Sequence, residues 1–449
     1  MKKLFGTDGV RGIANKELTC ELTMNLGRAA GMILSEYCKH KPVFIIGKDT
    51  RISSDMLESS LVAGICSVGA DVIILGVVPT PAVAFLVKKY NADAGFMISA
   101  SHNPMEYNGI KIFNNDGYKL PDEIEAKIEN LMQFKNFNLK YGSNLGRVTI
   151  KNSAVIDYIE HIKSTVNELD FSGIKIAVDC ANGSASTTAK QLFSLFNVNP
   201  FFINNNPDGI NINQNCGSTH MKCISNFVKE NNCDIGFAFD GDADRCLIVD
   251  ENGEILDGDK IIAILSKYLK ENNKLAKNTF VVTVMSNLGL LKMAKEHDIN
   301  VEKTKVGDRY VLEKMLEYGY CIGGESSGHI ILSEHSTTGD GQLVAIQFLK
   351  IIKELNAKVS ELSKVMDILP QILINVPVSN LEKYRIANNP YIIEQVSLLE
   401  KELGENGRIL LRPSGTEPLI RVMVEGTNNV HINKIANQLS TIVKERFGI

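Results

Sequence analysis

Residues 43–99 read VFIIGKDTRISSDMLESSLVAGICSVGADVIILGVVPTPAVAFLVKKYNADAGFMIS. In this stretch, short apolar runs rich in β-branched residues alternate with longer segments of helical periodicity. We predict strands at 43–47, 72–77 and 95–99, with helices at 53–68 and 82–90 between them. This β-α-β order is typical of a mostly parallel sheet that is covered by helices on both faces.

The same alternation begins twice more along the chain. The second stretch predicts strands at 174–179, 201–203 and 235–239 and helices near 186–196 and 219–229. The third predicts helices at 259–270 and 288–296 on either side of a strand at 279–284. The sequence therefore predicts three tandem α/β units with mixed, mostly parallel sheets.

The last part of the chain has a different pattern. We predict antiparallel strands at 372–376, 409–411 and 419–425 and helices at 391–403 and 432–443, which together form a smaller α+β domain. A polar segment rich in Asn and Gly, at 133–151, is predicted to separate the first two units. The predicted domains are 1–152, 153–254, 255–368 and 369–449.

The composition excludes several classes of protein. The 449 residues carry 48 basic and 52 acidic side chains, and no block of five like charges favours nucleic acid or an anionic membrane as partner. The amino-terminal segment MKKLFGTDGV lacks the apolar stretch of a signal peptide, and no apolar run is long enough to span a bilayer. Nine cysteines without a C-x-x-C pair argue against a disulfide framework or a structural zinc site. A reduced, cytoplasmic location fits these features best.

Residues 99–104, SASHNP, directly follow a predicted strand. Ligands bind beyond the carboxyl ends of strands in open parallel sheets, and we expect Ser101 to be exposed there with room for a substituent. Ser101 is therefore a candidate nucleophile or phosphate carrier, and His102 is a candidate to shape the turn or donate a hydrogen bond. An ordinary Ser/Asn/Pro turn is the alternative, and this loop alone favours that alternative.

Residues 240–245, DGDADR, place three alternating carboxylates directly after the predicted strand at 235–239. Because three adjacent carboxylates repel one another, a divalent cation would relieve the cost of placing them together. Oxygen-only ligands favour Mg²⁺, Ca²⁺ or Mn²⁺ over zinc. The spacing overlaps that of an EF-hand, but Arg245 stands where an EF-hand needs glycine.

Three other loops carry weaker signals. Residues 323–329, GGESSGH, offer Glu325 and Ser327 to sugar hydroxyls, and His329 is as much a structural as a catalytic candidate. Residues 412–418, RPSGTEP, combine with Arg421 into a candidate phosphate cradle, for which the alternative is an ordinary hairpin loop. Residues 5–12, FGTDGVRG, form a further Gly-rich loop whose Arg11 could reach phosphate.

Taken together, the motifs FGTDGVRG, ISASHNP, DGDADR, VGDRYVLEKM, GGESSGH and RPSGTEPLIRVMVEG resemble the α-D-phosphohexomutase superfamily over the whole chain. Within it they are most similar to the bacterial phosphoglucosamine mutases. The resemblance implies four domains around a central cleft. It also implies interconversion of glucosamine 6-phosphate and glucosamine 1-phosphate through a phosphoserine and a 1,6-bisphosphate, on the route to UDP-N-acetylglucosamine and cell-wall precursors.

The resemblance also implies roles for individual residues. Ser101 would be the phosphoserine, and its phosphate would bind one Mg²⁺ together with Asp240, Asp242 and Asp244. The sugar hydroxyls would contact Glu325 and Ser327, and the phosphate that is not transferred would contact Arg412, Ser414, Gly415, Thr416 and Arg421. The groups close to the transferred phosphate would be Arg11, Lys111 and Arg245, and His102 is a further catalytic candidate. The general base is left open between Lys111 and His329, and a lysine base would need a pKa lowered by neighbouring cations.

Several alternatives remain open from the sequence. Mannose or glucose phosphates could replace glucosamine phosphate as the substrate within the same superfamily. A phosphosugar-binding regulator without turnover and a metal-dependent phosphatase are the rivals outside it. For the phosphoglucosamine mutase that the resemblance implies, the expected partner is a small aminosugar phosphate and the expected activator is glucosamine 1,6-bisphosphate. The chain is expected to be a monomer or a homodimer.

Overall fold

The computed structural model describes residues 4–6, 8–36, 38–166, 169–414 and 417–448. The chain divides into two compact units. The larger one comprises Met1–Met285 and Ile299–Val365, and the smaller one comprises Ser286–Asp298 and Met366–Ile449. No helix in the described part is long and apolar enough to cross a membrane.

The larger unit contains three sheets, and the first has seven strands in the order β1-β2-β6-β5-β3-β4-β7. These strands are β1 (Phe5–Gly6), β2 (Gly9–Ile13), β3 (Val43–Lys48), β4 (Asp71–Val77), β5 (Ala94–Ile98), β6 (Tyr107–Asn114) and β7 (Val148–Ile150). Pairings among β5, β3, β4 and β7 are parallel, whereas β1, β2, β6 and β5 pair antiparallel. The three predicted strands are confirmed, and the sequence analysis missed the other four.

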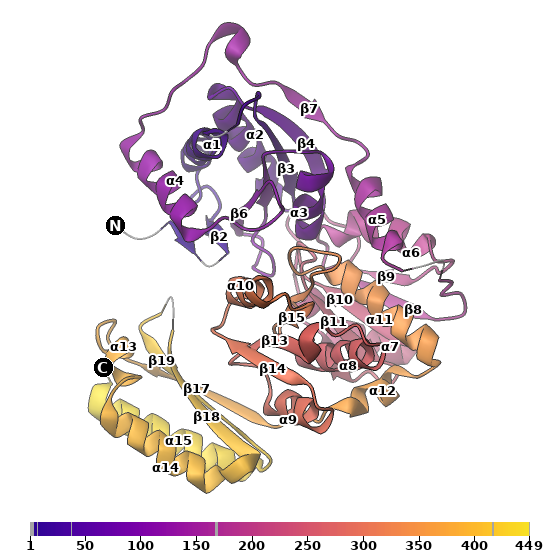
Figure 1. Cartoon of the computed structure of the whole chain (residues 1–449), viewed down its shortest axis with the longest axis vertical. Coiled ribbons are helices and arrows are strands. Elements are labelled where there is room, and N and C mark those ends of the chain that lie inside the picture. The colour runs from indigo at the N-terminus through magenta and orange to yellow at the C-terminus, as the bar shows by residue number, and fades with distance from the viewer. Residues whose placement is uncertain (1–3, 7, 37, 167–168, 415–416, 449) are drawn as a thin grey trace. The chain divides into compact units, whose positions relative to one another are not determined.

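Helices cover both faces of this first sheet (Figure 1). One face packs on α1 (Cys20–Ser35), α2 (Ile52–Ser67) and α4 (Asp122–Phe134), and the other packs on α3 (Thr80–Lys89). Alternate residues of a strand point to opposite faces, so Phe44 and Phe96 meet edge to face under the first group of helices, with ring centroids 5.8 Å apart. The spacing of apolar residues along the strands and along the helices thus produces the predicted layers, a sheet with helices on both faces.

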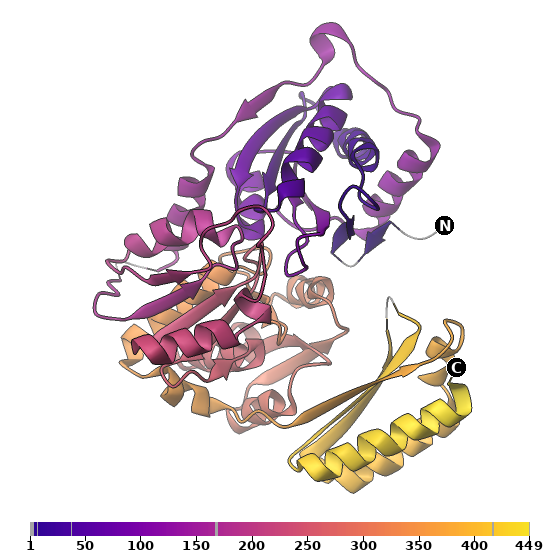
Figure 2. The same cartoon turned by 180° about the vertical axis from the view of Figure 1, so that it is seen from behind.

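The segment 133–151 was predicted to separate two domains. It runs from the end of α4 along the molecule to β7, which pairs in parallel with β4 (Figures 1 and 2). The polar segment therefore returns to the first sheet and adds its edge strand. The domain limits themselves remain predictions.

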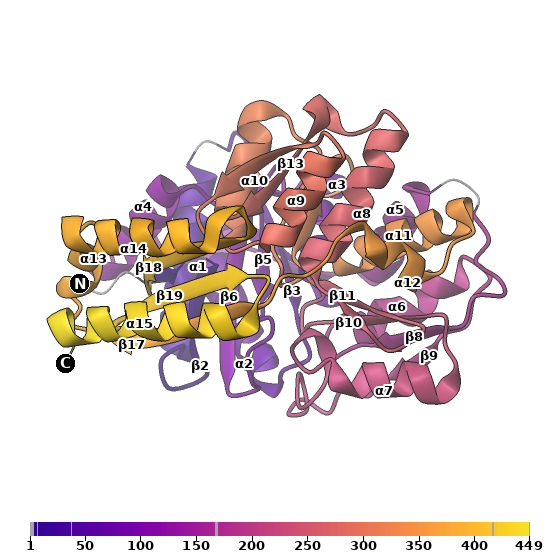
Figure 3. The ribbon, with the colours of Figure 1, turned by 90° about the horizontal axis from the view of Figure 1, so that it is seen from below.

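The second sheet has the order β12-β11-β10-β8-β9. Its strands are β8 (Ile176–Asp179), β9 (Phe201–Ile203), β10 (Ile235–Phe239), β11 (Cys246–Asp250) and β12 (Ile255–Leu256), and its helices are α5 (Ala154–Ser164), α6 (Ala185–Ser194) and α7 (Lys222–Asn231). Figure 3 shows α7 on one side of this sheet and α11 (Gly341–Leu355) on the other. The fully buried strand β10 ends directly before the three aspartates.

The third sheet has the order β14-β13-β15-β16. Its strands are β13 (Thr279–Thr283), β14 (Asn300–Thr304), β15 (Ile322–Gly324) and β16 (Ile330–Leu332), and the helices around it are α8 (Gly258–Glu271), α10 (Asp308–Tyr318) and α12 (Val359–Leu362). Strands β14, β13 and β15 are parallel, and β16 closes the sheet antiparallel to β15. The tight connection from β15 to β16 carries Glu325 and Ser327.

The smaller unit is an antiparallel sheet with its long helices on one side (Figure 2). Its strands, in the order β17-β19-β18, are β17 (Gln371–Pro377), β18 (Gly407–Pro413) and β19 (Leu419–Gly426), and its helices are α9 (Leu288–Glu296), α13 (Glu382–Ile386), α14 (Pro390–Leu403) and α15 (Asn429–Phe447). Apolar residues of the strands pack on α14 and α15. The predicted α+β pattern is confirmed.

Candidate active site

Ser101 follows β5 and adopts a left-handed backbone conformation with φ 53°. Its Oγ donates a hydrogen bond of 2.6 Å to Asp240 Oδ2. The residue is only 1% exposed, so the expectation of an exposed serine was wrong. Residues 240–245 come from the second sheet and cover the hydroxyl, which the sequence spacing could not indicate.

Three buried side chains that the sequence analysis missed fix the backbone around Ser101. Asp49 and Arg51, which follow β3, form an ion pair of 2.8 Å with no exposed side-chain surface. Arg51 donates to the Ser101 carbonyl at 2.9 Å, and Asn213 Nδ2 donates to the same oxygen at 2.9 Å. A sequence signal for the first two existed, because Asp49 and Arg51 follow an apolar strand at the same sheet edge as Ser101.

Asp240, Asp242 and Asp244 lie together and are all buried, with one carboxylate oxygen of each within 4.8 Å of the others. Burial, followed by the charges of the other two aspartates, raises the pKa of Asp240 well above its ordinary value. Asp242 Oδ1 and Asp244 Oδ1 are buried and receive no hydrogen bond from any described residue. Three buried carboxylates with unused oxygens fit a hard divalent cation, so the donor set matches a metal site.

Lys111, on β6, reaches the same carboxylates. Its Nζ donates to Asp242 Oδ2 at 2.8 Å and to Asp244 Oδ2 at 2.9 Å. Burial alone would lower the pKa of Lys111, but the charges of Asp242, Asp244 and Asp8 raise it well above the ordinary value. The neighbours of Lys111 in this arrangement are thus mainly anions, whereas the lowered pKa of a lysine base would require neighbouring cations.

His329, before β16, is the second candidate base. Its Nδ1 lies 3.7 Å from Asp244 Oδ1, and its Nε2 lies 3.5 Å from Asp308 Oδ2. Burial opposes protonation, but the two carboxylates outweigh it and raise the pKa of His329. Nε2 also accepts a hydrogen bond from the Gly339 N–H at 3.1 Å, so the neutral ring carries its proton on Nδ1, toward Asp244.

Two arginines and a histidine complete the surroundings of the hydroxyl. The Arg245 N–H donates to Asp240 Oδ1 at 3.2 Å, and Arg11 lies 3.4 Å from the Ala100 carbonyl. His102 Nδ1 lies 3.3 Å from Ser101 Oγ. Burial, and then the charges of Arg245 and Arg11, lower the pKa of His102 to about 4, so its ring is neutral near pH 7.

A second missed group extends this network. Lys119 pairs with Asp8, which precedes β2, and with Asp308, at the start of α10. Asp8 also pairs with Arg11 and lies 3.4 Å from the Lys111 ammonium. Thr80, at the start of α3, donates its hydroxyl to Asp242. Positive and negative side chains from the loops of the first and third sheets thus alternate around the aspartates.

The predicted sugar contacts lie in the β15–β16 connection. Glu325 Oε1 accepts a hydrogen bond from the Gly307 N–H at 3.1 Å, and the Glu325 charge raises the pKa of Arg245 together with the aspartates. Ser327 Oγ is buried and has no partner among the described residues. The second carboxylate oxygen of Glu325 and this hydroxyl are the polar groups that a ligand could engage.

The predicted phosphate loop lies in the smaller unit. Arg412 on β18 stands directly opposite Arg421 on β19. Burial and then the Arg421 charge lower the pKa of Arg412, and neither Nε has a partner in the described part of the chain. Two facing cations with unused donors fit an anion such as phosphate.

Lys383, which the sequence did not indicate as a site residue, binds the backbone of the rest of this loop. Lys383 Nζ donates to the Ser414 carbonyl at 2.9 Å and to the Glu417 carbonyl at 3.1 Å. Ser414 is buried, and its Oγ accepts from the Glu417 N–H at 3.2 Å. The remaining predicted contacts, Gly415 and Thr416, lie outside the described residues.

Comparison with known proteins identifies the family of the chain. Four models described as phosphoglucomutase/phosphomannomutase domains match the chain: domain I at residues 2–138, domain II at 156–253, domain III at 257–368 and the C-terminal domain at 373–442. This chain belongs to the phosphoglucomutase/phosphomannomutase family. It is accordingly a mutase, an enzyme of the isomerase class.

Curated relatives within the family match over the full length. A phosphoglucosamine mutase of Ruminiclostridium cellulolyticum is 54% identical and covers 100% of both chains. A phosphoglucosamine mutase of Clostridium botulinum is 53% identical and covers 99% of this chain and 100% of its own. The predicted resemblance and fold class are therefore confirmed.

Solved structures share the fold at low identity. A family protein from Burkholderia thailandensis superposes with a TM-score of 0.83 at 22% identity, covering 99% of this chain and 98% of its own. An N-acetylphosphoglucosamine mutase of Aspergillus fumigatus, solved with GlcNAc-6P and magnesium, gives a TM-score of 0.68 at 16% identity, covering 98% and 95%. At these identities the likeness concerns the fold alone.

Proposed function

We propose that this mutase interconverts glucosamine 6-phosphate and glucosamine 1-phosphate, with Ser101 as the phosphate carrier. The sugar follows from the full-length relatives, which are named phosphoglucosamine mutases at 53–54% identity. The carrier role follows from one observation. Ser101 is only 1% exposed, and its hydroxyl donates a hydrogen bond of 2.6 Å to one of three carboxylates in a buried cluster. A turn without a chemical role has no reason to bury that arrangement, because three neighbouring carboxylates are costly to bury even with one lysine as partner.

In this proposal the chain manages the charge of the phosphoserine, which is roughly −2. Arg11, Arg245 and Lys111 supply the positive charge around Ser101 and would stabilise the charge that spreads over the phosphoryl oxygens during transfer. His102, neutral near pH 7, can donate or accept one hydrogen bond beside Oγ without adding a charge.

Asp240, Asp242 and Asp244 would hold Mg²⁺ together with the phosphate on Ser101. When bound, the ion supplies positive charge that offsets the phosphoryl oxygens. In the structure, Lys111 neutralises two of these carboxylates. With the ion bound, the carboxylates would no longer need this charge, and Lys111 would be free to turn toward the phosphate.

The proposed reaction uses two phosphate positions. A sugar hydroxyl oxygen forms a bond to the phosphorus of phospho-Ser101, and the bond from phosphorus to Oγ breaks. A base takes the hydroxyl proton, and Oγ gains a proton as it leaves, which restores the serine hydroxyl. The resulting 1,6-bisphosphate must turn over before its other phosphate returns to Oγ. Arg412 and Arg421 would hold the phosphate that is not reacting, and Glu325 and Ser327 would orient the sugar ring.

Ser101→Ala tests the carrier role directly. The variant is expected to lose all measurable turnover, even with added glucosamine 1,6-bisphosphate, while its unfolding midpoint stays close to that of the wild type. Ser59→Ala, which removes an exposed hydroxyl on α2, is the matched control and is expected to retain full activity. Near-normal rates in Ser101→Ala would exclude the carrier role.

Sugar preference needs a separate measurement. Comparison of kcat/KM for the 6-phosphates of glucosamine, mannose and glucose is expected to favour glucosamine. A higher value for mannose or glucose 6-phosphate would assign the chain to another branch of the family. Absence of any product at saturating Mg²⁺ and bisphosphate would favour a regulator without turnover, and release of inorganic phosphate equal to sugar consumed would favour a phosphatase.

A further inference from the structure

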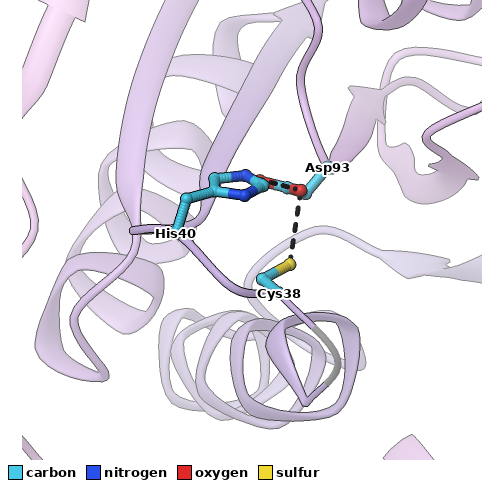
Figure 4. A group of neighbouring side chains, drawn as sticks. All are labelled: Cys38, His40 and Asp93. Atoms are coloured by element: carbon cyan, nitrogen blue, oxygen red, sulfur yellow. Dashed lines mark hydrogen bonds and ion pairs between the residues drawn. The ribbon is translucent and has the colours of Figure 1, made fainter.

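A second group of metal-ligating side chains lies in the first sheet's surroundings, away from Ser101. Cys38 and His40 belong to the connection between α1 and β3, and Asp93 immediately precedes β5. Figure 4 shows the three side chains pointing toward one another. Cys38 Sγ lies 3.3 Å from Asp93 Oδ1, and His40 Nε2 lies 3.1 Å from the Asp93 carboxylate. One ligand atom from each residue lies within 4.8 Å of the other two.

These separations match a shared metal ion. Zinc binds sulfur at about 2.3 Å and nitrogen or oxygen at about 2.0–2.2 Å in a tetrahedron, so its ligand atoms lie roughly 3.2–3.7 Å apart. The observed separations of 3.3 Å and 3.1 Å are close to this range. A thiolate, a carboxylate and a neutral imidazole carry two negative charges together, which a divalent ion balances.

The surroundings also support a site of this kind. Asp93 Oδ2 accepts the Val43 N–H at 2.8 Å, which fixes the carboxylate as outer partners commonly fix metal ligands. Cys38 and His40 line a surface cavity of about 680 Å³, so an ion and a further water ligand can enter from solvent. Cys38 and Asp93 are only partly exposed, whereas the His40 side chain is 62% exposed.

We propose that Cys38, His40 and Asp93 bind a divalent transition-metal ion of the zinc class through Sγ, Nε2 and a carboxylate oxygen. Asp93 precedes β5 and Ser101 follows it, so the two sites lie at opposite ends of one strand. The ion would therefore tie the chain before β3 to the chain before β5 and would not touch the reacting phosphate. Its role is to stabilise the first sheet.

The position of the ligands explains why the sequence analysis argued against a zinc site. Asp93 is 53 residues from His40 and 55 residues from Cys38. Only the fold brings the two connections together at the amino ends of neighbouring parallel strands. A search for paired cysteines cannot find a site with one sulfur ligand.

Cobalt titration of the full-length protein tests the proposal, because Co²⁺ occupies zinc sites and a thiolate ligand produces a charge-transfer absorption band. With excess Mg²⁺ and a thiol-free reductant present, the wild type is expected to show this band at one Co²⁺ per chain. The oxygen-only aspartate cluster cannot produce it. The band is expected to disappear in Cys38→Ser and to remain in Cys223→Ser, whose cysteine is exposed and distant in sequence.

Two further variants separate binding from general loss of structure. Asp93→Asn retains an oxygen for the Val43 N–H, and His40→Ala removes an exposed ring, so both are expected to fold. Each is expected to weaken Co²⁺ and Zn²⁺ binding by more than the roughly 10- to 100-fold that loss of an outer partner costs. Zn²⁺ is also expected to raise the unfolding midpoint of the wild type and not that of Cys38→Ser.

Three results would overturn the proposal: no charge-transfer band at saturating Co²⁺, a band that persists in Cys38→Ser, or an equal Zn²⁺ effect on the unfolding midpoints of the wild type and Cys38→Ser. Any of them would leave a hydrogen-bonded Cys-Asp-His group without an ion. None of them would bear on the carrier role of Ser101, since the two sites share no residue.

Discussion

Ser101 Oγ and Asp240 Oδ2 are joined by a 2.6 Å hydrogen bond although the two residues are 139 positions apart in the chain. They follow strands of two different sheets, β5 and β10, so the contact exists only because the carboxyl ends of those strands meet. The hydroxyl proposed to carry phosphate is therefore already in contact with the carboxylates proposed to hold its metal ion.

Asp242→Asn is expected to reduce kcat by roughly 100-fold or more and to weaken the Mg²⁺ dependence of the reaction, because it removes one charged ligand from the cluster. The amide can still accept a hydrogen bond from Thr80, so the fold should persist. The measurement is the rate as a function of Mg²⁺ concentration.

The matched control for this prediction is Asp234→Asn. Asp234 immediately precedes β10, and among the interactions described its carboxylate accepts only the backbone N–H of Lys175. It is expected to leave the Mg²⁺ titration unchanged. Identical titrations for Asp242→Asn and the wild type would argue against the metal site.

Arg421→Ala is expected to raise KM by about 10- to 100-fold with a smaller effect on kcat, because a charge-assisted hydrogen bond to phosphate contributes about 1.5–3 kcal/mol. Steady-state kinetics with glucosamine 1-phosphate measure this. Arg385→Ala removes a 74%-exposed arginine of the same unit and should leave KM unchanged. If both variants behaved alike, Arg421 would have no specific role in binding.

Lys119→Met is expected to destabilise the larger unit by about 1.5–3 kcal/mol, because the part-buried Asp8 and Asp308 carboxylates lose the cation that they share, although Arg11 still pairs with Asp8. Urea unfolding measures the difference. Lys267→Met, which breaks a solvent-exposed pair with Glu271, should cost no more than about 0.5 kcal/mol. Equal losses would mean that the Lys119 network contributes no special stability.

Asp340→Asn is expected to remove part of the pH dependence of stability. Burial raises the pKa of Asp340 from 3.8 to about 6, and its Oδ1 accepts the Leu343 N–H and the Tyr158 hydroxyl. A raised pKa favours the protonated folded state, so the wild type is expected to lose about 2 kcal/mol as pH rises from 4 to 6. Asparagine retains the acceptor but does not titrate.

The measurement for Asp340 is the difference in unfolding free energy between the wild type and Asp340→Asn across that pH range. Other carboxylates titrate in both proteins and cancel in the difference. A difference that stays constant with pH would show that Asp340 does not have the raised pKa.

The sequence predicted the loops of the site because each loop follows an apolar strand. The strand at 235–239 was predicted to the residue, since five apolar or small residues stand directly before the polar DGDADR. The same reasoning located Ser101, which follows the strand predicted at 95–99. Local periodicity is therefore enough to locate where a strand ends and a loop with candidate site residues begins.

Features that depend on distant parts of the chain were not predictable in this way. The burial of Ser101 depends on Asp240, and the charge around Lys111 depends on Asp8, which lies on another strand connection. Lys119 lies 189 positions from its partner Asp308. No pattern within one segment reports such pairs, so the predicted exposure of Ser101 did not match the structure, and the anions beside Lys111 could not be predicted.

Intact mass spectrometry tests the central claim most directly. The full-length protein is incubated with glucosamine 1,6-bisphosphate and Mg²⁺, its mass is compared before and after, and the modified residue is mapped by peptide sequencing. The expected result is the gain of one phosphoryl group per chain on Ser101, and no gain in Ser101→Ala. A phosphoryl group on a different residue, or unchanged mass in a preparation that turns over substrate and carries no phosphate on Ser101, would contradict it.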